Sequence, residues 1–162
     1  MPRQSEIEIG KRSPSAESGS TNRASQPDAS FSWPIRVYWE DTDAGGIVYY
    51  ANYLKFMERA RTEWLRALGI EQGPLRDEQR LMFVIVDTQV EFKKPARYGD
   101  ALIVTAHLAD ASRASLRFRQ EVLRGQELLV AGSVRVACLD AESYRPRGLP
   151  RPLIEQLTRR SS

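Results

Sequence analysis

The residues best suited to chemistry lie together at positions 40–53, which read E-D-T-D-A-G-G-I-V-Y-Y-A-N-Y. Two aspartates and two adjacent glycines separate a strand-like segment from a long amphipathic one. A helix that starts here leaves its first N–H groups without intrahelical acceptors and carries partial positive charge at that end, which suits a developing oxyanion. The stretch can therefore supply a carboxylate and an oxyanion site, the two components that acyl transfer needs.

The residues alone leave the roles of the two aspartates open. Turn formation and helix capping are frequent functions of aspartate, and either one explains Asp41 or Asp43. Gly45 and Gly46 shape the loop under any of these interpretations, because glycine adopts turn conformations readily. Glu40 is expected to end the preceding strand.

Composition predicts one folded domain that follows a tail. The chain has 162 residues, of which 41% are hydrophobic, and this suits a single core. Residues 1–30 are rich in Ser, Pro, Gly, Asn and Gln, so we expect a disordered tail there and a folded domain over residues 31–158. Neither a secretory signal nor an apolar run of about 20 residues is visible. Cys138, the one cysteine, fits a reducing compartment and a place in the core.

The charge pattern does not by itself indicate a partner. The net charge is +3, and several arginines lie close to the C-terminus. A solvated basic surface is the preferred interpretation, and attraction for nucleotide phosphates or acidic lipid is the alternative. No nucleic-acid-reading motif accompanies the charge, so nucleic acid is not expected as a partner. One histidine and one cysteine far apart give no metal-ligand spacing, and we expect no metal and no other cofactor.

Hydrophobic periodicity predicts one helix and about five strands. Alternation over residues 35–40 predicts a half-buried strand, and apolar residues at steps of three and four predict a helix over residues 51–68. Residues 72–80 are interpreted as a polar connection. Four further strands are expected over residues 83–94, 102–108, 115–122 and 128–139. In the first of these four, Val84, Val86, Val90 and Phe92 are expected to share one face.

This order of elements is typical of an α+β fold. One long helix would pack against an antiparallel sheet of about five strands. Two helical acids, Glu58 and Glu63, lie among basic residues, so a charged helix face is favoured over a catalytic role for them. His107, the one histidine, lies in a predicted strand, where a packed or exposed side chain is more common than a catalytic one.

Two segments resemble one known family. They are Y-W-E-D-T-D-A-G-G-I-V-Y-Y-A-N-Y-L-K-F-M-E-R-A-R-T-E-W-L (residues 38–65) and V-E-F-K-K-P-A-R-Y-G-D (residues 90–100). They are similar to the 4-hydroxybenzoyl-CoA thioesterase family, and within it to the acyl-CoA thioesterases associated with the Tol–Pal system. The resemblance runs over about residues 31–152 and implies the hotdog fold, in which a long central helix is wrapped by a curved sheet.

The resemblance assigns roles to the residues of the opening stretch. It implies that Asp43 is the catalytic carboxylate, either as nucleophile or as general base on water. The backbone N–H at about Tyr50 would polarise the thioester carbonyl. Many members carry His at the position of Tyr50, whereas members that act on aromatic acyl-CoA can carry Tyr. Since the unperturbed pKa of tyrosine is about 10, the base chemistry falls to Asp43. The substrate-binding residues are then expected to be Gly45, Gly46, Ile47, Val48 and Tyr49.

The resemblance also implies partners and a location. Acyl-CoA is the expected substrate, which is hydrolysed to a free acid and CoA, and acyl carrier protein is a further candidate partner. A homodimer or homotetramer is expected, with acyl sites at the dimer interface. The expected location is cytoplasmic, with peripheral association with the inner membrane.

Two other functions fit the same fold. A non-catalytic module that binds acyl-CoA or acyl carrier protein is the main alternative, and the presence of Asp43 argues against it. A hotdog dehydratase or hydratase would need a His with an acid, and no His lies near the loop or the helix.

Overall fold

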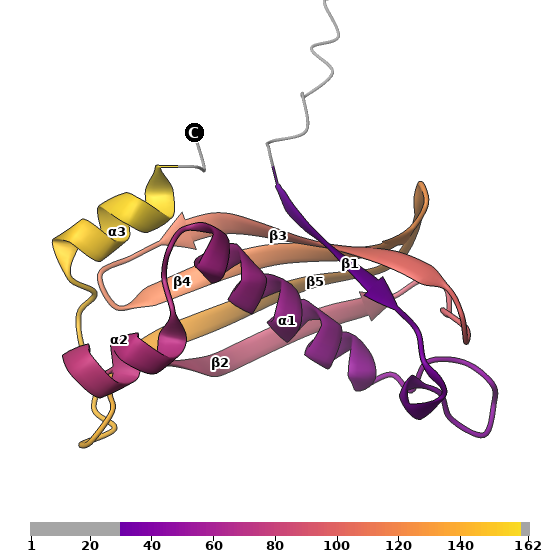
Figure 1. The fold of residues 1–162 in the computed structure, drawn as a ribbon, viewed down its shortest axis with the longest axis horizontal. Helices are drawn as coiled ribbons and strands as arrows, with labels where there is room; N and C mark the ends of the chain where they lie inside the picture. Colours follow the sequence, from indigo (N-terminus) through magenta and orange to yellow (C-terminus); the bar gives the residue numbers. More distant parts are fainter. Residues whose placement is uncertain (1–29, 160–162) are drawn as a thin grey trace, which may run out of the picture.

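In the computed structural model, which describes residues 30–159, one long helix lies against one face of a curved antiparallel sheet (Figure 1). The strands are β1 (Phe31–Arg36), β2 (Leu81–Phe92), β3 (Ala101–Ala111), β4 (Ser115–Arg124) and β5 (Glu127–Asp140). The helices are the short 3₁₀ turn η1 (Trp39–Asp41), the long α1 (Asn52–Ala67), and the shorter α2 (Gln72–Gln79) and α3 (Arg151–Thr158). This confirms the predicted α+β class and the five-stranded sheet. The expected tail lies outside the described residues apart from its last position.

The sheet has the order β1-β3-β4-β5-β2, and every neighbouring pair is antiparallel. The strands from β3 to β5 follow one another through short turns. β2 instead reaches the far edge beside β5, because α1 and α2 separate it from β1. The two edges of the sheet are therefore β1 and the longer β2.

The core lies between α1 and the sheet. One face of α1 is fully buried, and it contributes Tyr53, Phe56, Met57, Ala60 and Trp64. Trp64 meets Phe118 of β4 edge to face, with ring centroids 5.2 Å apart. Cys138 of β5 is buried, as the sequence predicts.

The side chain of Met57 in α1 reaches β5 at Gly132. A Cβ atom at this position would lie only 3.1 Å from the Met57 Cε and 3.2 Å from its Sδ. Such contacts are tighter than most that real Cβ atoms make, so a side chain here would require the end of Met57 to shift. The absence of a side chain at Gly132 therefore leaves space for Met57 in the core.

The predicted strand over residues 35–40 is wrong in its second half. β1 ends at Arg36, and the chain turns through η1 instead of continuing in an extended form. Ile35 and Val37 are buried as expected, but Trp39 is 70% exposed. The alternation of apolar residues in the sequence includes Trp39, which lies beyond the strand and faces outward from the turn. The pattern therefore predicted a strand that was too long.

Two other expectations need correction. Residues 72–80 are not a plain connection: α2 forms there, with Leu75 buried as its one anchor and Pro74 in the first turn, where proline is tolerated. In β2 the pairing register shifts between Ile85 and Asp87. The extra residue, Val86, is a β-bulge, and a bulge exchanges the inward and outward positions of the strand beyond it. Val84, Val86, Val90 and Phe92 therefore do not share one face.

Candidate active site

Buried Asp41 organises the passage from β1 to α1. Its carboxylate Oδ2 accepts a hydrogen bond from the Tyr38 N–H at 2.8 Å. Its backbone carbonyl accepts two more, from the Tyr49 N–H at 2.9 Å and from the Asn52 side-chain amide at 2.9 Å. Asp41 is 7% exposed, and it therefore acts as the turn-forming aspartate rather than as one that meets solvent or substrate.

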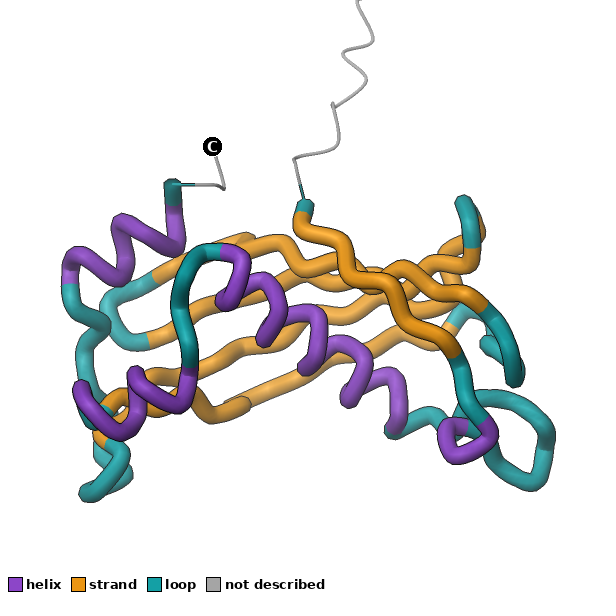
Figure 2. The backbone as a smooth tube through the Cα atoms, viewed as in Figure 1, coloured by secondary structure: helices purple, strands orange, loops and turns teal. Residues whose placement is uncertain are grey.

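Asp43 lies in a tight hairpin that projects from this turn. The bridge between Thr42 and Val48 closes the hairpin, and the Asp43 N–H donates to the Ile47 carbonyl at 2.9 Å. The Asp43 carboxylate Oδ1 accepts the Gly45 N–H at 2.8 Å, which holds an exposed carboxylate in a defined orientation. Figure 2 shows the loop extending past the first turn of α1.

Each glycine of the hairpin is required for a separate reason. A Cβ atom on Gly45 would lie 3.0 Å from the Asp43 Oδ1, so a side chain there would push the carboxylate away. Gly46 has a φ of 73°, in the left-handed region that glycine adopts without strain. The absence of a side chain at Gly45 thus leaves space for the Asp43 carboxylate, and Gly46 allows the chain to turn.

The start of α1 presents backbone donors. Ala51 is the N-cap residue, and no side chain caps the helix. The Tyr49 and Asn52 N–H groups are already bonded, whereas those of Tyr50 and Ala51 have no hydrogen-bond acceptor among residues 30–159. Free N–H groups at a helix start carry partial positive charge and suit a developing oxyanion.

Tyr50 opens onto a hollow of about 240 Å³ beside the helix start. Its phenol ring meets Phe92 of β2 edge to face, with ring centroids 6.2 Å apart. The residues that line the hollow are Ile47, Val48, Tyr50, Tyr53, Phe92, Lys93, Lys94 and Pro95. Of the expected substrate-binding residues, Ile47 and Val48 thus reach the hollow. Gly45, Gly46, Tyr49 and Asp43 itself do not line it within one chain.

The segment that joins β2 to β3 completes this end of the molecule, and no role was predicted for its residues. The Val48 N–H donates to the Ala96 carbonyl at 2.9 Å, and Ile47 forms a bridge with Arg97. The Tyr53 hydroxyl accepts the buried Ala96 N–H at 2.9 Å. Burial raises the pKa of Tyr53, so this phenol stays neutral and its hydroxyl proton stays in place.

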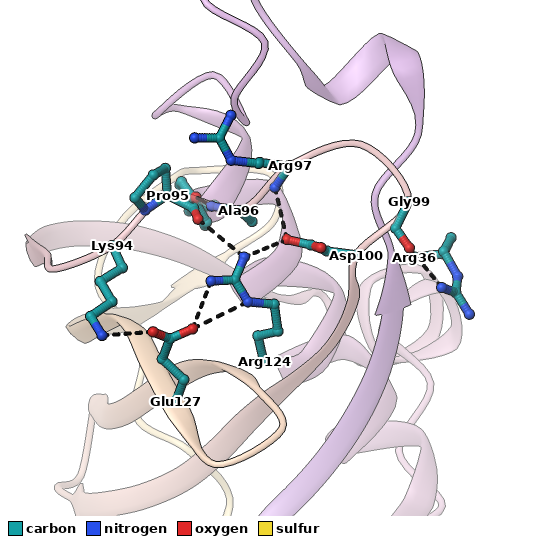
Figure 3. A network of polar contacts seen from close by, with 10 residues as sticks. Arg36, Lys94, Pro95, Ala96, Arg97, Gly99, Asp100, Arg124 and Glu127 are labelled. Carbon is teal, nitrogen blue, oxygen red and sulfur yellow. Dashed lines mark hydrogen bonds and ion pairs between the residues drawn. The ribbon is translucent and has the colours of Figure 1, made fainter.

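An ionic network centred on Arg124 holds the same segment from the other side (Figure 3). The Arg124 guanidinium contacts the Asp100 carboxylate at 2.8 Å and the Glu127 carboxylate at 2.6 Å. Lys94 contacts Glu127 at 2.6 Å, and the Arg97 N–H donates to Asp100 at 2.9 Å. Burial opposes the ionisation of Asp100, but the Arg97 N–H and the Arg124 guanidinium outweigh it and lower its pKa.

The two helical acids lie in different surroundings. Glu63 contacts Arg66 at 2.6 Å and belongs to the charged helix face that the sequence predicts. Glu58 lines a groove between α1 and β2, together with Arg61 and Ile85. The Arg61 guanidinium donates to the buried Gln120 side chain at 2.6 Å. Burial lowers the pKa of Arg61, and nearby Glu58 opposes this effect.

His107 lies apart from the hairpin. It pairs with Arg119 in the middle of the sheet, at a half-buried position between two inward-facing residues of β3. Within residues 30–159, no group of three His, Cys, Asp or Glu side chains could hold a metal ion. No helix in this part of the chain is long and apolar enough to cross a membrane.

The family model of the thioesterase-like superfamily matches residues 37–157. The chain belongs to this superfamily. This thioesterase-like chain is 42% identical to the acyl-CoA thioesterase YbgC of Haemophilus influenzae over 124 residues, which cover 76% of the chain and 91% of that relative. It is also 42% identical to the acyl-CoA thioester hydrolase YbgC of Escherichia coli, over 78% of the chain and 94% of the relative.

A solved structure supports the fold of this superfamily member. The crystal structure of a probable thioesterase from Bartonella henselae matches with a TM-score of 0.72 and 34% identity, and covers 75% of the chain and 100% of that structure. The family expected from the two sequence segments is confirmed, and so is the hotdog fold.

We expect Tyr53→Phe to destabilise the protein. The substitution leaves the Ala96 N–H buried without an acceptor, which costs about 1–3 kcal/mol. Urea unfolding at fixed protein concentration measures the loss. Tyr144→Phe is the matched control, because Tyr144 is 65% exposed. Equal stability of the two variants would show that the bond to Ala96 contributes nothing.

Proposed function

We propose that this protein is an acyl-CoA thioesterase, which hydrolyses a thioester to a free acid and CoA. One observation carries the proposal: the loop between η1 and α1 holds an exposed, oriented carboxylate and leads into a helix start with free N–H groups. The relatives named acyl-CoA thioesterases, which match most of the chain, support the same activity.

Asp43 supplies the attacking group in this proposal. A thioester is already activated, so its hydrolysis needs a nucleophile and a site for negative charge. Asp43 either attacks the carbonyl carbon and expels the CoA thiolate, leaving an anhydride that water hydrolyses, or removes a proton from the attacking water. In both routes the carbonyl oxygen becomes negative, and the Tyr50 N–H donates to it at the helix start.

The Tyr50 side chain has a different role from its backbone. Its phenol has no part as a base in this proposal, because Asp43 takes that role. Its ring instead forms one wall of the hollow that it shares with Phe92, where it contacts the acyl group. Ile47 and Val48 contribute to the same wall, and Gly45 and Gly46 shape the hairpin.

A second copy of the chain is part of the proposed enzyme. β2 is a long edge strand with unpaired backbone groups, and Ile85 and Val86 on it are 52% and 49% exposed. Such an edge joins readily to another strand. In a homodimer formed through β2, the groove between α1 and β2, which Glu58 and Arg61 line, lies beside the partner chain. The two chains then share the acyl site. Two such dimers can form a homotetramer.

The remaining expectations are part of the same proposal. Acyl carrier protein is a second thioester donor. The enzyme acts in the cytoplasm, where it attaches peripherally to the inner membrane and is associated with the Tol–Pal system. The domain of residues 31–158 performs the chemistry. Resemblance to the family supports each of these features.

Asp43→Asn should reduce thioester hydrolysis by at least about 100-fold, because the amide neither attacks nor accepts a proton. The variant should stay folded and still bind CoA. Release of free thiol from a panel of acyl-CoAs measures the rate, and the panel also gives the preferred acyl group. Glu40→Gln is the control, since it removes an exposed carboxylate from the same loop.

Two outcomes of that experiment contradict the proposal in different ways. Full activity of Asp43→Asn would remove Asp43 from the mechanism. A wild-type chain that binds acyl-CoA but hydrolyses no acyl-CoA or acyl-carrier substrate would instead indicate the non-catalytic binding module.

Gly45→Ala should lower kcat by about 10- to 100-fold, since the added methyl group displaces the Asp43 carboxylate and small errors in position are costly in catalysis. Gly73→Ala is the control, because a Cβ there meets no atom within 4 Å. Steady-state kinetics with the preferred acyl-CoA gives both values. An unchanged kcat in Gly45→Ala would mean that the carboxylate needs no fixed orientation.

Val86→Lys should convert dimers to monomers, because it places a charge on the exposed β2 edge. Light scattering coupled to size exclusion measures the mass in solution. Gln126→Lys adds the same charge in the exposed turn between β4 and β5 and should leave the mass unchanged. A dimer that persists in Val86→Lys argues against assembly through this edge.

A further inference from the structure

Two exposed aromatic rings form a flat platform beside the Asp43 hairpin. The Trp39 and Tyr98 rings stack with centroids 3.8 Å apart and an angle of 10° between their planes. Each ring covers one face of the other, yet Trp39 is 70% exposed and Tyr98 is 50% exposed. Their outer faces are therefore open to a further planar group.

The platform is held in place by the backbone around it. The Thr42 N–H and hydroxyl both donate to the Trp39 carbonyl, at 3.1 and 2.8 Å. On the other side, Arg97 is bridged to Ile47, and its N–H is bonded to Asp100. The same hairpin that carries Asp43 thus positions both rings, and a ligand would find the stack already formed.

Two arginines flank the platform. The Arg36 guanidinium donates to the Gly99 carbonyl at 2.7 Å, which fixes it against the turn that carries Tyr98 and leaves its other N–H donors free. Arg97 uses only its backbone in the ionic network, and Figure 3 shows its guanidinium pointing away from Asp100. Neither arginine has a carboxylate partner within 4.0 Å among residues 30–159, whereas Lys94 does.

We propose that this surface binds an adenine nucleotide, with the purine stacked on Trp39 and the phosphates on Arg36 and Arg97. Aromatic rings stack on any base, and guanidinium groups favour phosphate. Under the proposed function the nucleotide is the 3′-phospho-ADP portion of CoA, whose thioester end then reaches the neighbouring hairpin. A free adenine nucleotide offers the same chemistry, so the two sources must be separated by experiment.

Direct titration of the full-length protein with adenosine 3′,5′-bisphosphate and with ADP tests the platform independently of turnover. Trp39→Leu should weaken binding by about 10-fold, in the range expected for loss of one stacking contact. Trp39→Tyr should retain most of the affinity, and Arg97→Gln should weaken binding and reduce its dependence on salt. The controls are Tyr144→Asn and Arg76→Gln, which remove an exposed aromatic ring and an exposed arginine near the other end of the sheet.

Kinetics then identifies the source of the nucleotide. If it belongs to the substrate, Trp39→Leu raises KM for acyl-CoA by about 10-fold with little change in kcat, because the contact is the same in ground and transition states. It leaves kcat/KM unchanged for the same acyl group on N-acetylcysteamine, which has no nucleotide. If both nucleotides bind but KM for acyl-CoA is unaffected, the platform serves a free nucleotide.

Two results separate the platform from the proposed enzyme. If neither nucleotide binds, or if Trp39→Leu binds them as well as the wild type, the platform proposal is overturned. If the nucleotides bind through Trp39 but no thioester is hydrolysed, the platform stands and the proposed activity fails.

Discussion

Asp41 is the residue on which the geometry of this end of the molecule depends. Its carboxylate accepts a hydrogen bond from Tyr38, just after β1, and its carbonyl accepts hydrogen bonds from Tyr49 and Asn52 at the start of α1. One residue therefore connects the two segments. The hydrogen bonds that Asp41 accepts from Tyr49 and Asn52 hold the two ends of the hairpin of residues 42–48 together. Asp43 lies in this hairpin. A buried carboxylate is costly unless it is bonded, so the turn and the burial of Asp41 stabilise each other.

The other side of the site depends on charge rather than on a single turn. The segment between β2 and β3 meets the hairpin through Ala96 and Arg97, and the Arg124 network holds it in position. Arg124 lies at the end of β4, and Glu127 lies at the start of β5. Two strands that contribute nothing to the proposed chemistry therefore fix the surface on which both the hollow and the aromatic platform are built.

Local patterns in the sequence predict α1, four of the five strands and the turn of the hairpin. The spacing of apolar residues places α1 to within one residue at each end, and the adjacent glycines mark a turn that the structure contains. The same reasoning missed α2, because a polar helix with one buried leucine has little periodicity. It also extended β1 through Trp39, whose outward direction depends on the turn made by Asp41.

Contacts between segments that are distant in the sequence could not be predicted from it. Nothing near Tyr53 indicates that its hydroxyl bonds Ala96, and nothing near Trp39 indicates that Tyr98 stacks on it. Segment 90–100 was part of the family resemblance, but its residues carried no role until the fold placed them beside the hairpin. The roles of Asp43 and Tyr50 stay predictions, supported by an arrangement that suits them.

The bulge at Val86 determines where β2 can lose a residue without inverting its faces. Before the bulge Phe83 faces the core, and after it Val90 does, so the two halves of the strand are in opposite phase. Loss of the extra residue alone would restore regular pairing with β5 and keep both halves facing as they do now. Loss of a residue from either half would instead turn outward side chains of that half inward. Descendants of this sequence can therefore shorten β2 at the bulge, but they must keep the count of residues on each side of it.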